Sequence, residues 1–128
     1  MTTRRSTVLV AGLAFAAGGG LGWVGRPSQQ TTHREPQFEN EQVRVWKSII
    51  MPRQPLALHR HDHGRALIAL TDGRLDVVDQ DGQTVRTYDW TRGKAYWLDA
   101  DPPGQLHADL NNTSDPIEVI VVELKHDR

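Results

Sequence analysis

From Phe38 to the C-terminus, short apolar runs alternate with clusters of turn-forming residues. Within the runs, apolar and polar positions alternate or β-branched residues predominate, which is typical of strands. No stretch has a helical period long enough to predict a helix. Asp79 to Gly82 separates two of the runs and indicates a β-hairpin. We therefore expect an all-β sandwich or barrel with strands at 43–50, 65–70, 74–78, 84–90, 94–98, 105–110 and 117–125.

The first 27 residues follow a different pattern. Arg4 and Arg5 precede a run from Val8 to Val24 that contains no charged residue. A basic start followed by an apolar run is the arrangement of a secretory signal, and the paired arginines resemble a twin-arginine export signal. The run also reaches the lower length limit, roughly 17 residues, for crossing a bilayer. Residues 1–27 are thus expected to contact the export machinery or the membrane, either as a cleaved signal or as an anchor.

This expectation places the protein outside the cytoplasm, in the periplasm or anchored to the membrane and facing the periplasm. Residues 28–37 are polar and without period, so we expect a linker there. Residues 38–126 are expected to form one folded domain, because a chain of 128 residues has room for a single core.

Composition excludes several classes of function. The chain has 15 Lys and Arg against 16 Asp and Glu, so it has no excess of basic residues and nothing in its charge predicts nucleic-acid binding. It contains no cysteine, which excludes disulfides, thiolate metal sites and cysteine nucleophiles. A transition metal would therefore have to be held by nitrogen and oxygen ligands.

Such nitrogen ligands are concentrated at one point of the chain. His59, His61 and His63 alternate along a segment that ends before Gly64. In an extended segment, side chains two residues apart leave the backbone on the same side, so two imidazoles could reach one divalent cation. An HxH pattern alone is a weak signal that is also typical of a solvated strand end, and a third ligand would have to come from elsewhere in the chain.

Two groups of residues carry a resemblance to a known family. His59-Arg60-His61 is followed by Gly73, and Gly93 is followed by a run from Pro102 to Asn111 that reads PPGQLHADLN. These groups resemble the two motifs of the cupin superfamily, G(X)5HXH(X)3-4E(X)6G and G(X)5PXG(X)2H(X)3N. The PXG(X)2H(X)3N part is reproduced in full. The resemblance covers residues 38–126 and implies a small double-stranded β-helix, or jelly-roll barrel.

The chain departs from these motifs at three points. Arg53 stands where the first motif opens with glycine, and the gap between Gly93 and Pro102 is longer than in the family pattern. Counted back from Gly73, Ala66 stands where the first motif has its glutamate, the usual carboxylate ligand of the family. The resemblance therefore implies a metal site that lacks this carboxylate.

By the same resemblance, His59, His61 and His107 are the expected ligands of a divalent transition metal. Fe²⁺ is the foremost candidate, with Mn²⁺, Ni²⁺ and Zn²⁺ as alternatives. His63, Glu123 and Asp109 are candidates for residues that surround the ligands, although a solvated position is an equal alternative for His63. No catalytic residue can be named from the sequence.

Three functions are compatible with this site. The first is a metal-dependent enzyme of the cell envelope, foremost an oxygenase and otherwise an isomerase or lyase, that acts on a small anionic chelating substrate. The second is a non-catalytic module that binds a metal or a small molecule, and the third is a barrel that serves as an interaction platform. Because small open sheets have edges to cover, and because cupins commonly pair, a homodimer is also expected.

Overall fold

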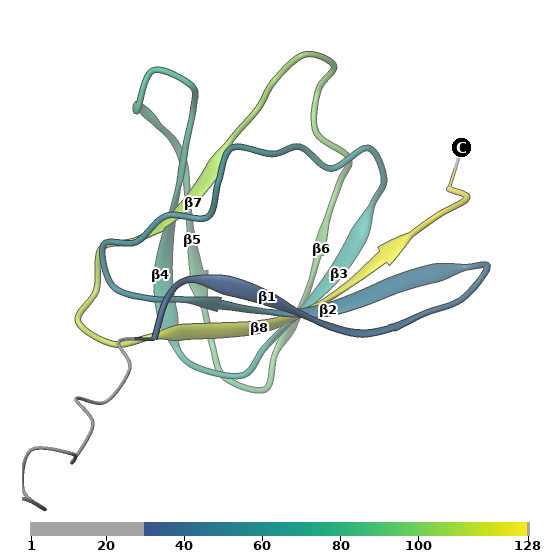
Figure 1. Cartoon of the computed structure of the whole chain (residues 1–128), viewed down its shortest axis with the longest axis horizontal. Helices are drawn as coiled ribbons and strands as arrows, with labels where there is room; N and C mark the ends of the chain where they lie inside the picture. The colour runs from purple at the N-terminus through teal and green to yellow at the C-terminus, as the bar shows by residue number, and fades with distance from the viewer. Residues whose placement is uncertain (1–29, 128) are drawn as a thin grey trace, which may run out of the picture.

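A computed structural model describes residues 30–127, which form two antiparallel sheets that face each other (Figure 1). The five-stranded sheet has the order β1-β2-β8-β3-β6, and the three-stranded sheet has the order β5-β4-β7. The all-β prediction is confirmed. The strands are β1 (His33–Glu39), β2 (Val43–Ile50), β3 (Arg65–Ala69), β4 (Gly73–Val78), β5 (Thr84–Trp90), β6 (Ala95–Leu98), β7 (Ala108–Asn111) and β8 (Ile117–Leu124).

One sequence prediction about the start of the domain was wrong. Residues 33–37, expected to be linker, belong to β1, which pairs with β2 at the edge of the larger sheet. Both faces of β1 are largely exposed, so its sequence needs no apolar alternation and gives no periodic signal. Pairing with β2 supplies the backbone hydrogen bonds, and the Thr32 hydroxyl donates to the Gln54 carbonyl just ahead of the strand (2.6 Å).

The export signal or anchor predicted for residues 1–27 lies outside the described residues, as do the first two positions of the predicted linker, 28 and 29. Within residues 30–127 there is no helix of the length and apolarity that a membrane span requires.

The inner faces of the two sheets form the core. Ile50 and Ile117 are almost fully buried, and Leu75 and Trp90 from the smaller sheet pack in the same cluster. Gly73 belongs to this packing: a Cβ atom there would lie 2.6 Å from Cγ1 of Ile117. The glycine that closes the first motif is therefore required by close contact between β4 and β8.

The segment that carries the HxH pattern runs beside β7 and extends the smaller sheet. The backbone N–H groups of Arg53, Leu56 and His59 donate to the carbonyl groups of Asn111, Asp109 and His107, at 2.7, 3.0 and 2.8 Å. Pro52 and Pro55 have no N–H to donate, which explains why this segment is extended without forming a regular strand. The pairing brings the HxH pattern next to the histidine of the second motif.

Candidate metal centre

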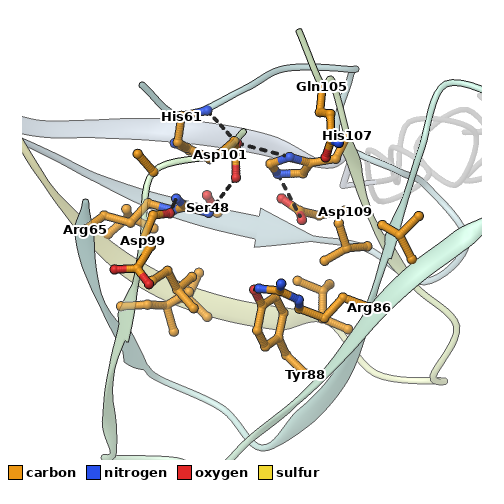
Figure 2. A pocket seen from close by; sticks show the side chains of 18 of the residues that line it. Ser48, His61, Arg65, Arg86, Tyr88, Asp99, Asp101, Gln105, His107 and Asp109 are labelled. Carbon is orange, nitrogen blue, oxygen red and sulfur yellow. Dashed lines mark hydrogen bonds and ion pairs between the residues drawn. The ribbon is translucent and has the colours of Figure 1, made fainter. Parts of the chain in front are cut away.

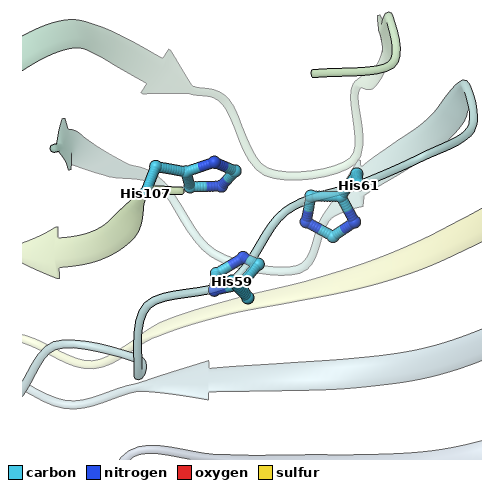
Figure 3. A group of neighbouring side chains, drawn as sticks. All are labelled: His59, His61 and His107. Carbon is cyan, nitrogen blue, oxygen red and sulfur yellow. The ribbon is translucent and has the colours of Figure 1, made fainter. Parts of the chain in front are cut away.

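His59, His61 and His107 come together at one end of the space between the sheets (Figure 3). One nitrogen atom from each imidazole lies within 4.8 Å of the corresponding nitrogen of the other two. The backbones of His59 and His107 form a reciprocal pair of hydrogen bonds, each 2.8 Å long. The main chain therefore fixes the separation of the two motifs before any side chain contributes.

In each of the three imidazoles, the Nδ1 atom faces an oxygen acceptor. Nδ1 of His59 donates to the carbonyl of Ala57 (2.7 Å), and Nδ1 of His61 donates to Oε2 of Glu123 (2.7 Å). Nδ1 of His107 lies 3.3 Å from Oδ2 of Asp101. A histidine that donates through Nδ1 keeps its lone pair on Nε2, which is the arrangement found in metal-binding histidines. All three residues are therefore oriented as nitrogen ligands.

Burial keeps these imidazoles in the neutral form that binds metals. Desolvation is the largest influence on each, and it lowers the pKa of His59, His61 and His107 below the ordinary value of 6.5. The hydrogen bond to Glu123 opposes this effect at His61 without reversing it. At neutral pH all three Nε2 lone pairs are available.

The residues predicted to surround the ligands have different positions. Glu123 bonds to His61 as described, and it shares a face of β8 with the buried Val119 and Val121. Oδ2 of Asp109 lies 3.6 Å from Nε2 of His59, and its Oδ1 lies 3.9 Å from Nε2 of His107. His63 faces elsewhere, because its Nδ1 donates to Oδ1 of Asp127 near the C-terminus (2.6 Å).

Asp101 is a residue of the site that sequence analysis missed. Its Oδ2 accepts a hydrogen bond from the backbone N–H of His61 (2.6 Å) and faces Nδ1 of His107, while its own N–H donates to the carbonyl of His61 (2.8 Å). It connects the two histidine motifs. Its position directly before Pro102 and Pro103 of the second motif was the one available signal.

The structure also changes the interpretation of the position where the family motif has its glutamate. Burial alternates along β3, and Arg65 and Leu67 line the cavity between the sheets, so Ala66 faces the opposite side. The inward residue at the start of β3 is therefore Arg65. Its guanidinium is buried, donates to the carbonyl of Asp99 (3.0 Å) and lies 3.9 Å from Oδ1 of Asp101.

A cavity of about 740 Å³ opens in front of the histidines (Figure 2). His61, His107 and Asp109 line it. The ring centroid of His59 lies 5.0 Å from that of His61 and 4.4 Å from that of His107. Trp46 stacks parallel to His61 with a centroid distance of 6.0 Å.

The cavity wall that faces the histidines is formed in part by Arg86 and Tyr88 of β5 (Figure 2). Nη1 of Arg86 donates to the Tyr88 hydroxyl at 3.0 Å. Among residues 30–127, no carboxylate forms an ion pair with Arg86 within 4.0 Å, so its remaining donors are available to a ligand. The cavity therefore combines nitrogen ligands on one side with a guanidinium on the other.

Comparison with known proteins identifies solved structures that have a similar fold. No family model and no curated protein matches the sequence. Among solved structures, a cupin domain protein from Bordetella pertussis Tohama I is 24% identical, with 75% of this chain and 95% of that chain covered and a TM-score of 0.64. An RmlC-like cupin family protein from Methanocaldococcus jannaschii is 18% identical, with 80% and 87% covered and a TM-score of 0.57.

A third similar structure, a protein with a double-stranded β-helix domain from Klebsiella pneumoniae, is 22% identical, with 80% of this chain and 84% of that chain covered and a TM-score of 0.56. These similarities agree with the two facing sheets. The protein therefore has the cupin fold, a double-stranded β-helix, and carries within it a three-histidine group that could hold a metal ion.

Proposed function

We propose that this protein binds a divalent transition metal through His59, His61 and His107 and uses the site to bind a small anionic chelating molecule. The observation that carries the proposal is the arrangement of the imidazoles: one nitrogen atom of each lies within 4.8 Å of those of the other two, and each Nδ1 faces an oxygen acceptor. Imidazole ligands suit Fe²⁺ as well as Zn²⁺, Ni²⁺ and other divalent ions, so the donor set fits such a metal without selecting one.

The cavity supports an anionic partner. Arg34, Arg65 and Arg86 line it, and the donors of Arg86 that do not bond to Tyr88 have no carboxylate partner among residues 30–127. A guanidinium opposite the metal ligands could accept a carboxylate in a paired geometry while the other end of the molecule approached the histidines. A volume of about 740 Å³ is within the range of small-molecule sites.

Within this proposal, the foremost activity is oxygenation. A redox-active divalent metal held by three histidines would supply open coordination positions for dioxygen and for a chelating substrate. The residues of the chain would orient the ligands and hold the substrate anion. The alternative is a module that binds the same class of molecule without turnover.

Metal analysis of protein purified without chelators tests the proposal directly. We expect close to one transition-metal ion per chain, whereas fewer than about 0.2 equivalents after incubation with Fe²⁺, Mn²⁺, Ni²⁺ or Zn²⁺ would exclude metal binding. Oxygen uptake by the iron-loaded chain, supplied with thiols, diketones or catechol-type acids, then separates the enzyme from the binding module. Uptake with none of these classes would favour the module.

The proposal includes the location and assembly expected from the sequence, which is export to the periplasm or its membrane face and pairing as a homodimer. Replacement of Arg4 and Arg5 by lysine should block export through the twin-arginine route. Light scattering on purified protein should give the mass of two chains, and a monomer at all concentrations would remove the dimer from the proposal.

A further inference from the structure

The side chain of Asp109 places carboxylate oxygens near the Nε2 atoms of two of the three histidines. It comes from β7, two residues after His107, and lines the cavity with about a sixth of its side chain exposed. Its two oxygens face different histidines, Oδ2 towards Nε2 of His59 at 3.6 Å and Oδ1 towards Nε2 of His107 at 3.9 Å. In both rings the Nδ1 atom faces an oxygen acceptor, so the two Nε2 atoms are the ones that the proposed metal would bind.

These contacts are not hydrogen bonds. A separation of 3.6 Å is too long for one, and both Nε2 atoms carry lone pairs because the Nδ1 atoms face oxygen acceptors. Nε2 of His59 is buried and has no hydrogen-bond partner among the described residues. Carboxylate oxygens and imidazole lone pairs therefore face one another without a proton donor between them, and burying such acceptors without a partner is unfavourable. A cation between them would satisfy all of them.

The distances suit this role. Ligand atoms that share a metal at about 2.0–2.2 Å lie about 3 Å apart when they are adjacent in its coordination sphere. The observed separations of 3.6 and 3.9 Å exceed this value by less than an ångström. Among the described residues, the group of ligand atoms within 4.8 Å of one another contains only the three histidines, so the Asp109 side chain would also have to move towards His61 when a metal binds. Carboxylate oxygen combined with imidazole nitrogen is a donor set suited to divalent first-row metals.

The position at which the cupin motif has its glutamate cannot supply the carboxylate in this chain. Ala66 faces away from the cavity, and Arg65 is the inward residue at the start of β3. We propose that Asp109 takes over this role from the opposite sheet, so that the proposed metal has three nitrogen ligands and one carboxylate oxygen ligand, His59, His61, His107 and Asp109. This inference rests on the proposed metal-binding function.

A carboxylate ligand changes the charge of the centre. With three neutral imidazoles alone a divalent ion would keep its full charge of +2, whereas the Asp109 carboxylate would reduce it to +1. Attraction of an anionic molecule would then depend more strongly on Arg65 and Arg86, which line the same cavity.

The test compares Zn²⁺ and Co²⁺ affinities by competition with a chromophoric chelator, using the full chain. In Asp109→Asn we expect affinity to fall by more than about 100-fold, beyond the roughly 10–100-fold that loss of a partner around the ligands causes. Asp99→Asn removes a cavity carboxylate that bonds to Trp97 instead of the histidines, and it should bind like the wild type. Glu123→Gln supplies the comparison for a partner of a ligand.

An affinity loss in Asp109→Asn no greater than that in Glu123→Gln would overturn the inference while leaving the proposed function intact. Failure of the wild-type chain to bind either metal would instead overturn the proposed function, and this inference with it. If Asp109→Asn does not fold, ¹³C NMR of wild-type protein labelled at the aspartate carboxyl carbons decides the question. On addition of Zn²⁺ the resonance of Asp109 should shift more than that of Asp101, and the reverse order would overturn the inference.

Discussion

His33 and His61 both contact a glutamate, and they show how position in the fold decides what that contact does. His33 lies on the exposed edge strand β1, with its Nε2 3.2 Å from Oε1 of Glu35. His61 lies at the end of the cavity, with its Nδ1 2.7 Å from Oε2 of Glu123. Hydrogen bonds to the backbone of Thr31 and to Glu35 raise the pKa of His33, whereas desolvation lowers that of His61.

The difference shows that a carboxylate partner alone does not make a histidine cationic. In water the glutamate favours the imidazolium, and the contact is a surface ion pair of small energetic value. In the cavity, burial penalises the charged form more strongly than the glutamate favours it, so Glu123 orients a neutral imidazole. The contact between His33 and Glu35 therefore favours a charged imidazole. The contact between His61 and Glu123 leaves the imidazole neutral, which is the form that binds metals.

The largest expected difference between the two regions is the loss of metal affinity when a histidine is replaced. His61→Ala and His107→Ala should each weaken Zn²⁺ or Co²⁺ binding on the order of 1,000-fold, because each removes a ligand from a site of few donors. His33→Ala should bind metal like the wild type. Competition with a chelator measures all three, and equal weakening by His33→Ala would remove the distinction.

A smaller effect is expected from the glutamates. Glu123→Gln should reduce metal affinity by about 10–100-fold, since the neutral amide orients His61 less firmly and lowers its basicity. Glu35→Gln removes the corresponding partner of His33 and should leave affinity unchanged. Both variants should keep the circular dichroism spectrum of the wild type, and a loss of metal affinity in Glu35→Gln would contradict the separation of the two sites.

The smallest effect concerns pH in the metal-free chain. Histidine in an unfolded chain has a pKa of about 6.5. The pKa values of His59, His61 and His107 in the folded chain are lower than this. Below pH 6.5 the unfolded chain therefore binds more protons at these positions, and the free energy of unfolding should fall as pH falls from 7 to 5. The raised pKa of His33 affects stability in the opposite direction. The stability that His33 contributes is present below pH 6.5 and is lost as pH rises.

Urea titrations at several pH values measure this dependence. Replacing His61 by glutamine should flatten the loss of stability on acidification. Replacing His33 by glutamine should leave that loss intact or deepen it. An unchanged pH dependence in His61→Gln would show that His61 does not contribute to the effect.

Much of the fold could be predicted because its strands have a buried face. β2, β3, β4 and β8 alternate or concentrate apolar residues, and turn residues separate them. β1 could not be predicted in this way, because an edge strand with two exposed faces shows no alternation. The convergence of His107 with His59 and His61 could be predicted only through the resemblance, since nothing in the spacing links positions so far apart.

The carboxylates were harder to place. Glu123 and Glu118 lie on opposite faces of β8, and the sequence could not decide which faces inward; the structure directs Glu123 to His61 and Glu118 to Lys47. Asp101 lies in a loop, where no periodicity indicates direction. Counting along the first motif selected Ala66, although the pleat of β3 turns Arg65 inward instead.

The reciprocal backbone bonds between His59 and His107 also bear on how this barrel can diverge. Main-chain groups hold the two motifs together, so a substitution of either histidine by a residue other than proline keeps the donors and acceptors of this pair. In His59 and His107, the backbone atoms hold the fold together and the side-chain nitrogens form the three-histidine group. The side chains at these two positions can therefore change while the backbone pairing between them is kept.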